Sequence, residues 1–260
     1  MSTVPSKAHY SIEYPTSDGK PMAETDHHRD LMLASIETLK FWFAHKPKVY
    51  VSGNLLMYYV PGNKRKHVSP DVFVVRGVGM KQRLYYLTWE EGKNPDFIME
   101  ITSSSTRRED TKKKFVLYRD VLKVKEYFLF DPFGDYLKPQ LQGYRLQKGD
   151  YVPIPLIDGR MPSKVVNLHL EVAGSMVRLY DPVSQKWVPT PQERAEQAQQ
   201  QAEQAQQRAE QAQQQATEAQ QRAEQAQQRA EQMQREKDAL AEETQRLREE
   251  IDRLRGQSNP

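Results

Sequence analysis

Two acidic residues stand where their side chains could bind a cation. Asp71 opens the segment SPDVFVV, and Glu100 lies within PDFIMEITSSS, which otherwise has the composition of a buried strand. Side chains alternate along a strand, so a core face made by Phe97, Met99 and Ile101 leaves Glu100 on the opposite face. A carboxylate buried without a cation or cationic partner is strongly unfavourable or stays protonated. A metal ion would remove that conflict.

Further chemical groups follow Glu100 on a segment with helical spacing. Arg107, Asp110, Lys114 and Tyr118 recur at three- and four-residue intervals and therefore form one stripe. Hard cations such as Mg²⁺ prefer oxygen ligands, which two carboxylates on neighbouring strands could supply. A lysine nearby could hold or activate the attacking water. Together these groups are the minimum required for metal-assisted hydrolysis of a phosphodiester.

Each of these residues also has a purely structural interpretation. Pro-Asp before a strand is often a turn in which the aspartate bonds to its own backbone. A carboxylate in a strand can pair with an arginine or face water. Lys112, Lys113 and Lys114 have the pattern of a solvated helix face, and His27 and His28 fit the polar start of a helix. The combination of residues is therefore more informative than any one of them.

The elements that must position these residues are predicted from hydrophobic periodicity and from capping and turn signals. The expected elements are a helix from Thr25 or Asp26 to about Lys46, a long strand over residues 48–60, a strand over 69–78, a third strand or an excursion over 83–89, a strand over 96–102, a helix from about Arg107 to about Val121 behind a Thr106–Glu109 capping box, a strand over 125–132, and short strands to about Val188. This order predicts an α/β or α+β fold with at least one crossover helix.

Composition divides the 260 residues into an irregular arm (1–22), a compact domain (23–189) and a tail of Ala, Gln, Glu and Arg (190–260). Residues 1–189 hold 28 of the 38 Lys and Arg and 21 of the 35 Asp and Glu, a net charge of +7. Residues 190–260 hold 10 and 14, a net charge of −4. The basic part is the one expected to meet a polyanion, although a charge of this size also suits solubility alone.

The tail repeats a seven-residue unit close to RAEQAQQ. With Ala195 at heptad position a and Ala198 at d, the later core positions include Met233, Leu240, Leu247, Ile251 and Leu254, while Glu243 and Glu250 fall at g and Arg248 and Arg255 at the following e. This arrangement predicts interhelical ion pairs and a coiled coil of about 62 residues, about 90 Å long. The alternative is a solvated Gln-rich helix, because alanine buries little surface.

The sequence also excludes several classes of site. It has no cysteine, which excludes disulfides, thiolate metal sites and thiol nucleophiles. No stretch approaches the roughly 20 apolar residues of a membrane span, and MSTVPSKAHYSIEY lacks the apolar core of a secretory signal. We therefore expect a cytoplasmic protein that does not enter a membrane.

The segments SPDVFVV, PDFIMEITSSSTRRED and KKKFVLYRDVLKVKEYFLFDP together resemble the Uma-two family of endonucleases, a branch of the PD-(D/E)XK nuclease superfamily. The likeness covers roughly residues 20–180, and VYVSGNLLMYYVPGNKRKHVSPD is similar to the version common in cyanobacterial members. The resemblance implies a restriction-endonuclease-like mixed sheet flanked by helices.

The resemblance also implies roles for individual residues. Asp71 matches the motif aspartate and Glu100 the motif glutamate, and both would bind Mg²⁺ or Mn²⁺, with the Ile101 carbonyl as a further ligand. The superfamily places its lysine two residues after the glutamate, where this chain has Thr102. The sequence therefore departs from the simple motif at its third residue.

In this family the lysine lies on the next helix, within a D...K...Y pattern that Asp110, Lys114 and Tyr118 fit. Lys112 and Lys113 remain alternatives to Lys114 as the catalytic lysine. Asp110, Tyr118 and His28 are then expected to support the site.

These inferences predict a divalent-metal-dependent endonuclease that acts on DNA and forms homo-oligomers through its tail. The candidate contacts to backbone phosphates are Arg107, Arg108, Lys64, Arg65 and Lys66, each of which could equally be a solvated charge. One alternative is a protein that binds nucleic acid without cutting it, which a metal titration would distinguish. Another is an assembly factor whose coiled coil is the working part, which removal of residues 191–260 would distinguish.

Overall fold

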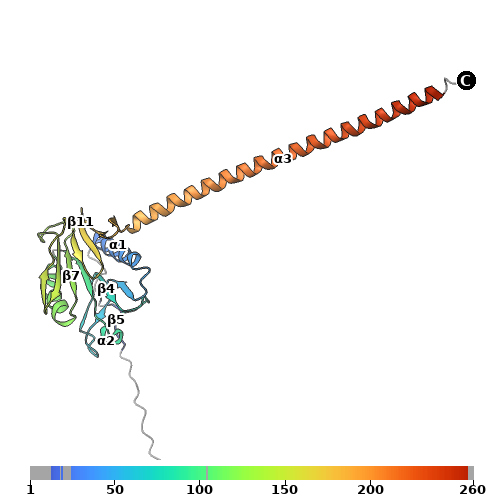
Figure 1. The fold of residues 1–260 in the computed structure, drawn as a ribbon. Helices are drawn as coiled ribbons and strands as arrows, with labels where there is room; N and C mark the ends of the chain where they lie inside the picture. Colours follow the sequence, from blue (N-terminus) through green and yellow to red (C-terminus); the bar gives the residue numbers. More distant parts are fainter. Residues whose placement is uncertain (1–12, 18, 20–24, 104, 257–260) are drawn as a thin grey trace, which may run out of the picture. The chain divides into compact units, whose positions relative to one another are not determined.

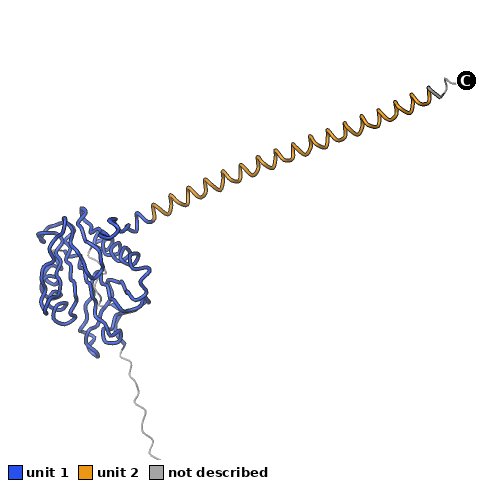
Figure 2. Tube along the Cα trace, in the orientation of Figure 1, with its two compact units in different colours: residues 1–194 blue, residues 195–260 orange. Residues whose placement is uncertain are grey.

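The structure is a computed structural model that describes residues 13–17, 19, 25–103 and 105–256. It contains two compact units, residues 1–194 and residues 195–260 (Figure 2). We describe each unit by itself.

The first unit is built on a six-stranded mixed sheet with the strand order β1-β4-β6-β7-β8-β9 (Figure 1). Its strands are β1 (Val49–Ser52), β4 (Val72–Arg76), β6 (Phe97–Ile101), β7 (Glu126–Phe130), β8 (Leu141–Gln147) and β9 (Asp150–Pro153). The β6–β7 pair is parallel, whereas the other four pairs are antiparallel. A parallel pair needs a crossover connection, and the helix between β6 and β7 supplies it. The predicted mixed sheet with a crossover helix is confirmed.

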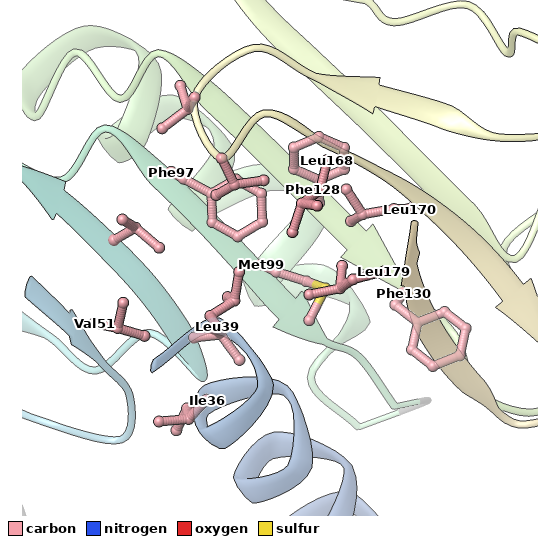
Figure 3. Packing of buried hydrophobic residues seen from close by; sticks show 14 of the residues in the cluster. Ile36, Leu39, Val51, Phe97, Met99, Phe128, Phe130, Leu168, Leu170 and Leu179 are labelled. Carbon is pink, nitrogen blue, oxygen red and sulfur yellow. The ribbon is translucent and has the colours of Figure 1, made fainter. Parts of the chain in front are cut away.

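One face of this sheet is covered by helix α1 (Asp26–Trp42) and by a four-stranded antiparallel sheet. The strands of the second sheet are β10 (Met161–Ser163), β11 (Leu168–Ala173), β12 (Met176–Asp181) and β13 (Lys186–Trp187). Of the two predicted starts, Thr25 caps α1 by accepting a hydrogen bond from the His28 N–H, and the helix ends a few residues before Lys46. Figure 3 shows Ile36 and Leu39 of α1 packed near Met99 of β6.

The opposite face of the sheet is covered by the crossover helix, which spans residues 107–121 as predicted. Most of it is π-helical, in the segments η1 (Glu109–Lys114) and η2 (Leu117–Val121). Wide turns of this kind bond each residue to the one five positions back and are frequent at functional sites. The start of the helix uses a different cap from the predicted one, because the side chains of Ser103 and Thr106 accept from each other's N–H groups.

The predicted long strand over residues 48–60 is wrong. The chain leaves the central sheet after Ser52, and a separate three-stranded sheet contains β2 (Met57–Tyr58), β3 (His67–Val68) and β5 (Tyr86–Leu87). At the break, Gly53 packs against the backbone of Asp71, and Asn54 adopts a φ of +45° while its N–H donates to the Pro70 carbonyl. Residues 83–89 form only the short β5 and the start of helix α2 (Thr88–Glu91).

Part of the expected irregular arm packs onto the first unit. Tyr14 is buried against Tyr58 and Leu87, and its hydroxyl accepts from the Gly62 N–H over 2.8 Å. Tyr58 in turn donates its hydroxyl to the Pro15 carbonyl. Residues 1–12, 18 and 20–22 of the predicted arm lie outside the described residues.

The tail forms one helix, α3 (Pro191–Gly256), of 66 residues. It begins with a capping box, because Thr190 Oγ1 accepts from the Glu193 N–H and the Glu193 carboxylate accepts from the Thr190 N–H. The side chains described from Ala195 to Leu254 are exposed on this single helix. Within the described parts of the chain, no helix combines the length and the apolar character that crossing a membrane requires.

Candidate active site

Asp71 and Glu100 meet where two neighbouring strands of the central sheet have their ends. Asp71 immediately precedes β4, and Glu100 is the penultimate residue of β6, which runs antiparallel to β4. The Asp71 N–H donates to Glu100 Oε2 over 3.3 Å, and the Ile101 N–H donates to Asp71 Oδ2 over 2.8 Å. Residues distant in sequence are thus held together by the strand pairing and by two hydrogen bonds.

The crossover helix brings an ammonium group and a hydroxyl to Glu100. Lys114 Nζ lies 2.9 Å from Glu100 Oε2 and 3.0 Å from Asp110 Oδ1. Tyr118 donates its hydroxyl to Glu100 Oε1 over 2.6 Å. The helical side chains follow one another at four-residue intervals, which places them on one face of the helix. Both carboxylate oxygens of Glu100 therefore have a partner from this helix.

Helix α1 contributes a histidine to Asp71. His28 Nε2 lies 3.2 Å from Asp71 Oδ2, and both side chains are about 15% exposed. Because the Thr25 cap binds the His28 N–H, it also holds the backbone of the residue that contacts Asp71. The contact of His28 with Asp71 is consistent with the supporting role expected for His28.

The electrostatics of the cluster follow from its burial. Burial raises the pKa of the fully buried Glu100 carboxyl, against the opposing effect of the Lys114 ammonium group. Burial alone would lower the pKa of Lys114, but the charges of Glu100, Asp110 and Asp71 outweigh it and raise that pKa above its usual value. Burial and the nearby Glu100 also raise the pKa of the Tyr118 hydroxyl, which remains a hydrogen-bond donor.

The three consecutive lysines of the crossover helix lie in different environments. Lys112 and Lys113 are exposed, whereas the Lys114 side chain is 14% exposed and contacts Glu100. Thr102, which stands where the superfamily motif usually has lysine, is buried and receives a hydrogen bond from the Tyr136 hydroxyl over 2.6 Å. The ammonium group beside Glu100 therefore comes from the helix and not from the strand.

The residues predicted to contact phosphates lie in two separate places. Arg107 and Arg108 are exposed at the start of the crossover helix. Lys64, Arg65 and Lys66 are exposed in the turn between β2 and β3 of the small sheet. For the described residues, the structure records no hydrogen bond or ion pair between that turn and the two carboxylates of the site. Only the arginine pair shares an element with Lys114.

Two tyrosines support the cluster although no sequence signal distinguishes them from core aromatics. Tyr127 of β7 is buried and donates its hydroxyl to the Asp110 carbonyl over 3.0 Å, which ties the crossover helix to the sheet. Tyr136, in the turn after β7, donates to Thr102 at the end of β6. Both positions became recognisable only from the structure.

The donor set of the cluster suits a hard divalent cation. The cluster holds three acidic side chains, Asp71, Glu100 and Asp110, beside the Lys114 ammonium group and the His28 imidazole, and a bound cation would favour the ionised form of the buried Glu100. No group of three His, Asp or Glu side chains among the described residues is arranged to hold a metal ion unaided. Backbone carbonyl and water oxygens would have to complete the coordination, and Mg²⁺ sites normally retain several waters.

Comparisons with known proteins match the two parts of the chain separately. No curated protein matches the chain. A solved structure described as "a putative nuclease belonging to DUF820", from Anabaena variabilis, is 17% identical over 56% of this chain and 78% of that chain, with a TM-score of 0.41. Residues 186–252 match the family model described as "Alanine-zipper, major outer membrane lipoprotein".

Residues 4–173 match the Uma2 family model, which is described as "Putative restriction endonuclease". The match includes every residue of the carboxylate cluster and of the crossover helix. Because it spans more than half of the chain, the protein belongs to the Uma2 family, as its motifs predicted.

Proposed function

We propose that this protein is a divalent-metal-dependent endonuclease that hydrolyses phosphodiester bonds in DNA. One observation carries the proposal. A strand start, a strand end and a crossover helix bring Asp71, Glu100 and Lys114 into one partly buried cluster. Membership of the Uma2 family supports the same class of reaction.

Asp71 and Glu100 would hold Mg²⁺ or Mn²⁺, with the Ile101 carbonyl as a further ligand. A bound divalent cation polarises a phosphate and lowers the pKa of a coordinated water. Tyr118 and Asp71 orient the Glu100 carboxylate through their hydrogen bonds, while His28 positions the Asp71 carboxylate. The chain thus presents two oriented carboxylates at one end of the sheet.

Lys114 acts in this proposal as a cation and not as a general base. A general base must be deprotonated near the working pH, whereas the carboxylates around Lys114 raise its pKa above the usual value. Its ammonium group can donate to an attacking water and stabilise negative charge that develops on the phosphate. Asp110, 3.0 Å from Lys114, holds that ammonium group beside Glu100.

We propose DNA as the substrate, and the net charge of +7 over residues 1–189 suits a polyanion. Arg107 and Arg108 would bind backbone phosphates near the cluster, which is supported by their exposure on the helix that also carries Lys114. Contacts of this kind bind the backbone without reading its sequence.

The tail is proposed to join copies of the protein. Met233, Leu240, Leu247, Ile251 and Leu254 are all exposed on the single helix, and burying them between helices would stabilise an assembly. The match to an alanine zipper supports helix–helix association through the preceding alanine heptads. An assembly of two or more first units would suit cleavage of a duplex, since each strand needs its own active site.

The proposal is tested by incubating purified protein with plasmid DNA and Mg²⁺ or Mn²⁺. Cleavage should require the metal and should be lost in Asp71→Asn and in Glu100→Gln, which change charge with little change of shape. Asp96→Asn is the matched control, because Asp96 is a buried carboxylate that immediately precedes β6, at the end of the strand opposite to Glu100. Cleavage that survives both substitutions in the cluster would place the activity elsewhere. Metal-dependent binding without cleavage would favour the non-cleaving alternative.

A further inference from the structure

The turn after β7 presents an exposed aromatic ring on an ordered backbone. Phe133 is 65% exposed, yet it lies between residues that a single carboxylate holds in place. The buried Asp131 side chain accepts hydrogen bonds from the N–H groups of Phe133, Gly134, Tyr136 and Leu137, at 2.9–3.3 Å. These bonds therefore hold the backbone that carries the ring, although the ring itself faces solvent.

This turn is tied to the carboxylate cluster by two independent contacts. The Phe133 ring lies 5.1 Å from the ring of His27, whose neighbour His28 contacts Asp71. At the other end of the turn, Tyr136 donates its hydroxyl to Thr102. Thr102 directly follows Ile101, whose N–H binds the Asp71 carboxylate. The turn that carries Phe133 thus contacts the sequence neighbours of two residues of the site, His28 and Ile101.

A cation accompanies the aromatic side chains of the turn. The guanidinium carbon of Arg107 lies 5.4 Å from the centre of the Tyr136 ring, and the Arg107 side chain is exposed. Positive charge that can follow a phosphate backbone, combined with an exposed aromatic face, is the arrangement by which proteins bind single-stranded nucleic acid. An exposed phenylalanine ring offers a π-face on which a base can stack.

We infer that Phe133, backed by His27, is a stacking platform for an unpaired nucleobase next to the phosphate that is cut. The inference rests on the proposed nuclease function and adds a class of substrate to it. The preferred substrate would have at least one unstacked base beside the cleavage position, as in single strands, frayed ends or a base extruded from a duplex. Arg107 would hold the adjoining phosphate.

The test uses short single-stranded DNA that contains 2-aminopurine, a fluorescent base that is quenched when it stacks. Full-length protein is titrated into this DNA in a buffer that contains Ca²⁺ in place of Mg²⁺, so that binding is measured without cleavage. Fluorescence anisotropy gives the affinity. The variants are Phe133→Leu, which removes the ring, and Phe133→Tyr, which keeps it. Phe41→Leu is the matched control, because Phe41 is a partly exposed aromatic residue at the end of α1 opposite to His27.

The wild type, Phe133→Tyr and Phe41→Leu should quench 2-aminopurine. Phe133→Leu should lose the quenching and bind single-stranded DNA about tenfold more weakly, the effect of one lost base–aromatic stack. Unchanged quenching and affinity in Phe133→Leu would overturn the inference and leave the nuclease proposal intact. Equal losses of quenching and affinity in Phe133→Leu and Phe41→Leu would do the same. Failure of the wild type to bind DNA at all would contradict both.

Discussion

Lys114 Nζ lies 2.9 Å from Glu100 Oε2, in a pair whose carboxylate is fully buried. The lysine comes from a crossover helix, and the glutamate comes from the strand that the helix connects to its parallel neighbour. The superfamily motif usually carries its lysine on the strand, whereas here the ammonium group beside Glu100 comes from outside the sheet. This arrangement allows Thr102 to occupy the usual lysine position and to bind Tyr136 instead.

Replacing Lys114 should damage the fold as well as the activity. Lys114→Met leaves Glu100 and Asp110 buried without their cation, and breaking a buried ion pair in this way costs about 3–5 kcal/mol. Lys113→Met, an exposed change one position earlier, should alter the free energy of unfolding by only about 0.5 kcal/mol. Urea denaturation of both variants at neutral pH measures the difference. Equal stabilities would show that Lys114 is not the partner of Glu100.

Removing the hydroxyl of Tyr118 should destabilise the protein more than removing that of Tyr127, although both side chains are buried. Tyr118→Phe removes a hydrogen bond to a carboxylate, worth about 1.5–3 kcal/mol, whereas Tyr127→Phe removes one to a backbone carbonyl, worth about 0.5–1.5 kcal/mol. Thermal unfolding in the presence of EDTA compares the two variants with the wild type. The opposite order of stabilities would contradict the role given to Tyr118.

Gly53 should not tolerate a side chain, because its backbone lies very close to that of Asp71. A Cβ atom there would lie 1.9 Å from the Asp71 carbonyl oxygen and 2.6 Å from Ile36 Cδ1, so Gly53→Ala must shift the backbone at residue 53 or 71 as well as the Ile36 side chain. We expect a loss of about 1–3 kcal/mol in stability and weaker metal binding, since Asp71 would move. Gly79→Ala is the control, because its nearest neighbour would lie 3.8 Å away. Wild-type metal affinity in Gly53→Ala would separate this contact from the site.

Disrupting the apolar end of α3 should dissociate the assembly without unfolding the first unit. Leu240→Asp combined with Leu247→Asp places charges at two d positions, where burial would be strongly unfavourable. The control pair, Glu242→Gln and Glu249→Gln, lies at f positions, which point away from a coiled-coil interface. Analytical ultracentrifugation at micromolar concentration should give an oligomer for the wild type and the control pair, and a monomer for the leucine pair. A monomeric wild type would contradict the proposed role of the tail.

Much of the positioning of the cluster could be predicted from local sequence. Strand alternation placed Glu100 opposite Met99, and the four-residue spacing of Asp110, Lys114 and Tyr118 placed them on one helix face. That Lys114 is the lysine in contact with Glu100 could be seen only in the structure, because Lys112 and Lys113 have the same chemistry and differ in exposure.

Other features depend on contacts between segments distant in the chain. The apolar run over residues 48–60 has the composition of one strand, and only the approach of Gly53 to the Asp71 backbone shows why it breaks. The π-helical turns have no distinct spacing signal, since side chains four residues apart also align in an α-helix. Similarly, the residues Pro-Phe-Gly at 132–134 favour a turn, but the contacts of this turn with Thr102 and His27 are not local information.

The central claim is that Asp71 and Glu100 together hold one divalent cation. Isothermal titration of Mn²⁺ into metal-free protein tests it directly, with the wild type, Asp71→Asn, Glu100→Gln and the control Asp96→Asn. We predict one Mn²⁺ per chain in the wild type and the control, and loss of that binding in each of the other two variants. Unchanged stoichiometry and affinity in either Asp71→Asn or Glu100→Gln would contradict the claim.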